Sequence, residues 1–125
     1  MKEIPGLAYA INRASKVGGD PLHRDVMLAM YVYELLIGKR AGRTWPMLKK
    51  HGDVETISRL VLKKTASQGY EVLVAAGRID LSFEAIALKY KSQFPENVVM
   101  AAKDRLGRDP YEGLLYEPKG SGSFN

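Results

Sequence analysis

Five basic side chains surround the single tryptophan of this sequence, in the stretch GKRAGRTWPMLKKH at residues 38–51. The five are Lys39, Arg40, Arg43, Lys49 and Lys50. Arginine and lysine bind phosphate, a hydroxyl such as that of Thr44 contacts phosphate oxygens, and an indole such as that of Trp45 stacks on a base. The stretch therefore has side chains suited to a nucleic-acid contact.

The charge of the whole chain is concentrated in this stretch. The net charge is +5 at pH 7, whereas residues 1–37 and 53–125 each hold equal numbers of acidic and basic groups. Five like charges close together repel one another in the free protein, and an anionic partner relieves that repulsion. We therefore expect the partner to be a nucleic acid, DNA or RNA, or an acidic protein surface.

The same residues have a structural interpretation. A basic segment between two helices can be solvated, or it can pair with acids that other helices present. Trp45 precedes Pro46, which suits the first position of a short helix, so the indole can anchor that helix in the core. The sequence leaves both interpretations open.

Other chemistry finds little support. The segment GKRAGRT resembles a phosphate-binding loop, but Gly38 and Gly42 are too close together and Arg43 stands where that motif needs lysine. His23 and His51 have no metal-ligand spacing, there is no cysteine, and no serine lies in a nucleophile motif. We expect no catalytic residue, no cofactor and no metal site.

Helix signals recur along the chain. Asp20 suits the N-cap of a helix with Pro21 at its first position, and Gly38 ends that helix after Ile37. The helix is apolar on nearly every side, which is typical of the centre of a domain. The alternative is that its segment 27–37 forms a homodimer face.

Further helices are expected in the second half of the chain, and a weaker one covers residues 5–17. Asp53 is expected to cap a helix that runs to Lys64, a short helix ends at Gly77, and Ser82 caps a helix that ends at Phe94. Glu84 is placed on the exposed face of that last helix. A final helix begins after Pro95 and ends near Gly107. The predicted fold is all-α, a compact bundle of five or six short helices in one domain, residues 1–107.

Residues 108–125 are expected to form an irregular extension with a flexible end, because proline and glycine recur throughout it. The longest apolar run, residues 27–37, is shorter than the roughly 20 residues of a membrane span. The sequence thus predicts a small cytoplasmic, non-catalytic protein that binds nucleic acid through residues 39–50. The alternative is a protein-interaction module or accessory subunit, in one form a homodimer through residues 27–37.

Overall fold

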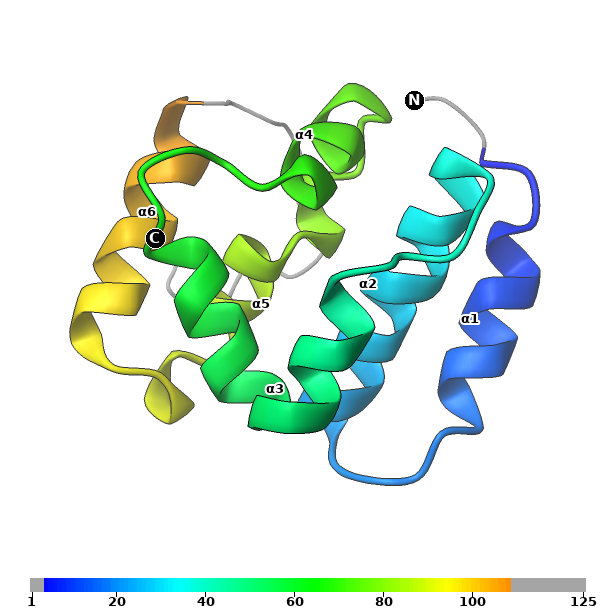
Figure 1. Ribbon diagram of the computed structural model, residues 1–125, viewed down its shortest axis with the longest axis horizontal. Coiled ribbons are helices and arrows are strands. Elements are labelled where there is room, and N and C mark those ends of the chain that lie inside the picture. The colour runs from blue at the N-terminus through cyan, green and yellow to red at the C-terminus, as the bar shows by residue number, and fades with distance from the viewer. Residues whose placement is uncertain (1–3, 109–125) are drawn as a thin grey trace, which may run out of the picture.

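The computed structural model describes residues 4–108, which contain six α-helices and two short 3₁₀ turns but no β-strand (Figure 1). The α-helices are α1 (Leu7–Ser15), α2 (Pro21–Ile37), α3 (Thr44–Val61), α4 (Gln68–Ala75), α5 (Phe83–Lys89) and α6 (Glu96–Arg108). The 3₁₀ turns are η1 (Ile79–Leu81) and η2 (Lys91–Gln93). The predicted all-α class is confirmed. No helix in the part described combines the length and the apolar character that crossing a membrane requires.

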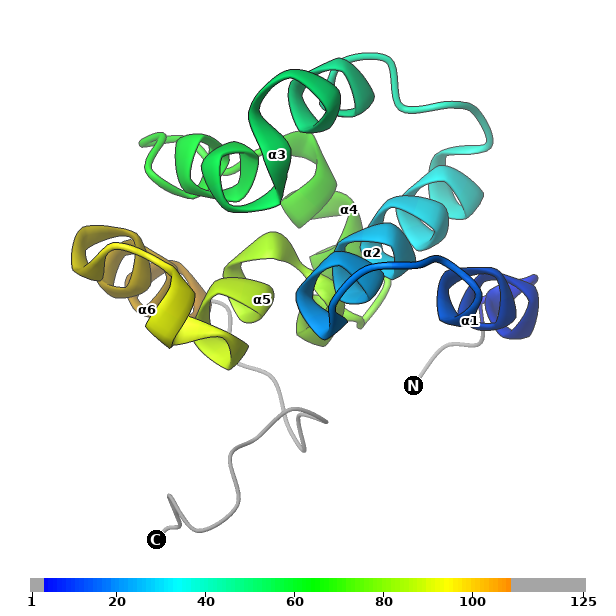
Figure 2. The ribbon, with the colours of Figure 1, turned by 90° about the horizontal axis from the view of Figure 1, so that it is seen from below.

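The helices form a row with one helix across it. Figure 2 shows α6, α5, α2 and α1 side by side, with α3 over one face of the row. The largest core cluster lies between the row and α3, where Val26 of α2, Ile57 of α3 and Ala87 of α5 are fully buried. This arrangement leaves the chain segments on either side of α3 exposed on one face of the molecule.

Helix α2 is the centre of the fold, as its apolar character predicted. Helices α1, α3, α4 and α5 all pack against it. The side chain of Asp20 accepts a hydrogen bond from the backbone N–H of His23, and Gly38 ends the helix with φ of +73°. Of the large hydrophobic residues of α2 only Leu35 is exposed, at 39%. Most of the other large apolar residues of this helix therefore pack against helices of the same chain.

Helix α3 changes direction at Gly52. The backbone there has φ of +84° and ψ of 176°, a combination that is essentially restricted to glycine. The Oδ2 atom of Asp53, which was expected to cap the second half of α3, lies 2.8 Å from the Nδ1 atom of His23. This contact ties the start of α2 to the middle of α3.

The remaining helix boundaries follow the sequence in part. Ser82 caps α5 as predicted, accepting a hydrogen bond from the backbone of Ala85, but α5 ends at Lys89 and η2 follows. Gly107 lies inside α6, which continues to Arg108. The rest of the predicted extension, residues 109–125, lies outside the described residues.

Candidate nucleic-acid interface

One carboxylate organises the start of the basic stretch. The Oε2 atom of Glu34, in the last part of α2, accepts hydrogen bonds from three donors of the linker and of α3. The donors are Nε of Arg40 at 3.2 Å, the backbone N of Ala41 at 2.8 Å and Nε1 of Trp45 at 2.6 Å. The linker, residues 38–43, is thereby fixed to the helix that precedes it.

These contacts make Trp45 a structural residue. Its ring centroid lies 6.2 Å from that of Tyr31, and its half-buried side chain packs against the main core cluster. The guanidinium of Arg40 lies 5.7 Å from the indole centroid. Pro46 is the third residue of α3, two positions later than expected, because the helix already begins at Thr44. The packing explains the position of Trp45 without a bound base, and stacking of its half-buried ring on a base stays a prediction from the sequence.

The charge on Glu34 is stabilised by its donors. Partial burial alone raises the pKa of the Glu34 carboxyl, but the hydrogen bonds from Trp45, Ala41 and Arg40 outweigh this effect, and the pKa is lowered overall. Glu34 is therefore ionised at neutral pH and neutralises Arg40. The prediction that acids of the fold could pair with the basic stretch is met at this one position.

The other four cations of the stretch remain unpaired. Lys39, Arg43, Lys49 and Lys50 are exposed, and none forms an ion pair with an acid among residues 4–108. Thr44 is half-buried at the start of α3. The charge excess seen in the sequence thus persists on the surface of the folded chain.

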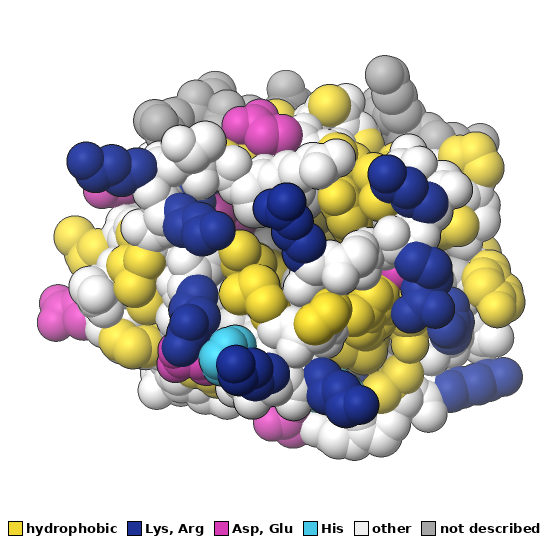
Figure 3. All heavy atoms as spheres, in the orientation of Figure 1, with side chains coloured by type: hydrophobic (Ala, Val, Ile, Leu, Met, Phe, Trp, Pro, Cys, Tyr) yellow, Lys and Arg dark blue, Asp and Glu magenta, His cyan; other side chains and the backbone are white. Residues whose placement is uncertain are grey.

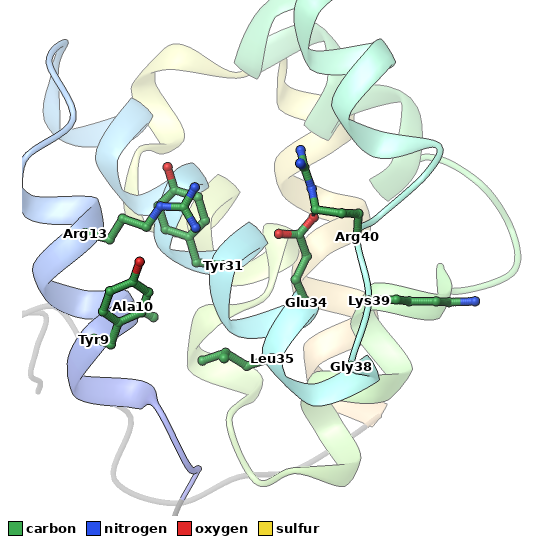
Figure 4. A pocket seen from close by; sticks show the side chains of 9 residues that line it. All are labelled: Tyr9, Ala10, Arg13, Tyr31, Glu34, Leu35, Gly38, Lys39 and Arg40. Atoms are coloured by element: carbon green, nitrogen blue, oxygen red, sulfur yellow. The ribbon is translucent and has the colours of Figure 1, made fainter.

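Two hollows flank the linker. The smaller, of about 380 Å³, lies between α1 and the end of α2 (Figure 4). In it the guanidinium of Arg13 lies over the ring of Tyr31, 4.1 Å from its centroid, while the side chain of Lys39 points away. Tyr9 and Leu35 add exposed apolar surface. This hollow is mainly aromatic and apolar.

The larger hollow, which we call the groove, has a volume of about 670 Å³ and lies between α2, the start of α3 and α4. Lys39, Arg40 and Arg43 line it from the linker, Thr44 lines it from α3, and Lys63 lines it from the segment after α3. Figure 3, in the orientation that has α3 in front, shows lysine and arginine side chains around exposed hydrophobic ones. The groove therefore combines a basic rim with an apolar interior.

Lys63 is the residue that sequence reasoning missed. In the sequence it follows Glu55 and Arg59 at the same spacing of four residues, a pattern typical of an exposed helix face, and those two form an exposed ion pair of 2.7 Å. Lys63 is separated from Arg43 by 20 positions in the chain, and only the fold brings it to the same groove. No local spacing in the sequence signals this proximity.

Glu84 is the one acidic residue among those that line the groove, and its predicted exposure is wrong. It is 2% exposed, and its Oε2 atom lies 2.8 Å from Nη1 of Arg105, which is also buried. Burial raises the pKa of Glu84 although Arg105 opposes the shift. The Nη2 atom of Arg105 in turn donates to the backbone oxygen of Lys63. Because Glu84 is buried and paired, the accessible charge of the groove is entirely positive.

Residues 4–108 contain no group of three or more histidine, aspartate or glutamate side chains placed to hold a metal ion.

Comparison of the chain with protein families, curated proteins and solved structures finds no match. Function must therefore be argued from the site itself.

Proposed function

We propose that this protein binds nucleic acid without catalysis, through the exposed cations Lys39, Arg43, Lys49 and Lys50. The observation that carries the proposal is that four of the five positive charges form no ion pair within residues 4–108, where Arg40 is the one that meets an acid. Phosphate groups of a nucleic acid neutralise such a surface and release counterions. The cytoplasmic location remains a prediction from the sequence.

The structure also decides which residues are suitable for a test. Reversing the charge of Arg40 would break its contact with Glu34, so a loss of binding could come from a displaced linker. Arg43 and Lys49 are exposed and form no ion pair with any acid in the part of the chain that the structure describes. They can be changed to glutamine with little effect on the fold.

The experiment is a fluorescence anisotropy titration of labelled single-stranded RNA and duplex DNA over a range of salt concentrations. The variant Arg43→Gln/Lys49→Gln should bind more weakly. Its log–log salt slope should be smaller in magnitude by about 0.7 for each lost contact with a single strand or about 0.9 for each contact with a duplex. The matched control is Lys91→Gln/Lys103→Gln, which removes two exposed cations that line neither hollow.

Equal loss in both double variants would contradict the proposal, because it would show that net charge alone determines binding. Absence of binding to either nucleic acid at low salt would contradict it as well. Circular dichroism of both variants should match that of the unmodified protein.

The second candidate function is a protein-interaction module, now supported by a different surface. Most apolar residues of α2 are buried, but Tyr9 is 64% exposed and Leu35 is 39% exposed, and both line the smaller hollow. Light scattering over a range of protein concentrations tests self-association through this surface. A monomer at every concentration would remove the homodimer form of this alternative.

A further inference from the structure

We infer that the groove accepts an unpaired base, so that the nucleic acid bound by this protein is single-stranded. The inference rests on the proposed function and makes it more specific. It follows from the cations, aromatic rings and polar groups that line the groove, and from the burial of Glu84, the one acidic residue among the lining residues.

The rim of the groove has the charges that a nucleic-acid backbone needs. Lys39 and Arg43 stand on the linker, and Lys63 stands on the segment after α3. All three are exposed, and none is paired with an acid among the described residues. Cations from two separate chain segments can contact phosphates on either side of one nucleotide.

The interior of the groove provides aromatic and apolar surface for a base. Tyr33 of α2 and Phe83 of α5 are half-buried and line it, with the buried side chains of Met30 and Leu73 alongside. The hydroxyl of Tyr33 forms no hydrogen bond within residues 4–108. Aromatic rings beside a basic track are the usual means by which proteins bind single strands without sequence preference.

Polar groups at the edge of the groove can contact the base. Thr44, Thr65 and Gln68 also line it, and they offer hydroxyl and amide groups. Glutamine pairs with the edge of adenine, and hydroxyl groups bind several bases. The volume of about 670 Å³ lies within the roughly 300–1,000 Å³ of sites that hold small organic groups. In a duplex the bases are stacked and paired, so they cannot enter this groove.

An acidic amphipathic peptide is the competing occupant, because it too would match a basic rim and an apolar interior. The amide and hydroxyl groups and the half-buried ring of Tyr33 favour a base. The test must therefore separate the base from the backbone charge.

The experiment compares three labelled probes with equal numbers of phosphates per strand: a single strand of mixed sequence, the same strand without bases, and a duplex. The single strand with bases should bind at least about fivefold tighter than the abasic strand, the lower end of what one stacked base contributes. The duplex should bind no more tightly than the abasic strand at equal phosphate concentration.

Two pairs of variants locate the effect in the groove. Tyr33→Leu removes the ring and should reduce the advantage of the bases toward onefold, while Tyr33→Phe keeps the ring and should preserve the advantage. Gly69 of α4 also lines the groove, and the nearest atoms to a Cβ atom there would be those of the Tyr33 ring and of Ser67 Oγ, at 3.9 Å or more. Gly69→Leu should therefore fill the groove and reduce the advantage of the bases toward onefold, whereas Gly69→Ala, which adds one methyl group at ordinary contact distance, should reduce it less.

The outcomes separate the inference from the proposed function. If the abasic strand binds as tightly as the strand with bases, the groove takes no base and the inference is wrong, although the phosphate contacts stand. If the duplex binds most tightly, the inference is wrong in the same way. If no probe binds at low salt, both proposals are overturned, and binding of a labelled acidic amphipathic peptide would then identify the competing occupant.

Discussion

Two carboxylates hold the two edges of the groove, and they do so in opposite ways. Glu34 is half-buried and fixes the linker by accepting three hydrogen bonds from the linker and α3. Glu84 is fully buried and pairs with Arg105, which in turn donates to the backbone oxygen of Lys63. The pKa of Glu34 is lowered and that of Glu84 is raised. The comparison shows that the number of donors decides the sign of the shift at the first site, whereas burial decides it at the second.

The largest effect is expected from Glu84→Ala. This change leaves Arg105 buried without its partner and should lower the free energy of unfolding by about 3–5 kcal/mol in urea titrations. The Nε atom of Arg105 already has no hydrogen-bond partner within the described residues. A loss below about 1 kcal/mol would mean that water reaches the pair.

The double variant Glu84→Leu/Arg105→Met is the matched control for this pair. Replacing both charges with apolar groups removes the cost of keeping them from water, so the double variant should lose less stability than Glu84→Ala alone. The opposite order would show that the pair contributes more than its desolvation costs.

A smaller effect is expected at the other edge. Glu34→Ala leaves three donors without their acceptor, but the side chain of Glu34 is 14% exposed, so water can replace part of what is lost. We expect a loss of about 2 kcal/mol in the free energy of unfolding. Trp45→Phe keeps an aromatic ring beside Tyr31 but removes the indole N–H donor and the second ring of the indole, and should cost about 1 kcal/mol or slightly more. A loss in Trp45→Phe as large as in Glu34→Ala would mean that ring packing, and not the carboxylate, holds the linker.

The smallest effect is on the pH dependence of stability, which should differ in sign between the two sites. Because the pKa of Glu34 is lowered in the fold, its contribution is full above the ordinary value of about 4.3 and is lost as the pH falls through the folded value. Because the pKa of Glu84 is raised, its contribution is full below about 4.3 and declines as the pH rises through the folded value.

The check is a comparison of the melting temperature across pH for Glu34→Gln and Glu84→Gln. Glu34→Gln should lose less stability on acidification than the unmodified protein, and Glu84→Gln should lose less on going from acidic to neutral pH. Changes of the same sign in the two variants would contradict the opposite shifts.

The same comparison shows what the sequence could predict. Asp20, Gly38 and Ser82 were identified as helix ends because a cap needs only a few neighbouring residues. Ser67 caps α4 by the same local rule, with a hydrogen bond from the backbone of Tyr70, and could have been found. Local signals therefore account for the helix ends that a capping residue marks.

Contacts between distant segments could not be predicted in this way. Glu84 was placed in solvent because a charged residue beside core positions is usually exposed, and its partner Arg105 follows 21 residues later. The basic stretch was identified by its charge, but the role of Trp45 depended on Glu34, 11 residues earlier across a linker. Lys63 joined the groove only through the path of α3 and the segment that follows it.

The position of Trp45 also gives the protein a built-in optical reporter. As the single tryptophan of the chain, it accounts for all of the indole emission, and its ring lies beside a carboxylate and a guanidinium. The wavelength of that emission depends on nearby charge, so it should change when Glu34 is protonated or when Arg40 moves. Occupation of either hollow beside the linker can thus be followed in the native protein without an attached dye.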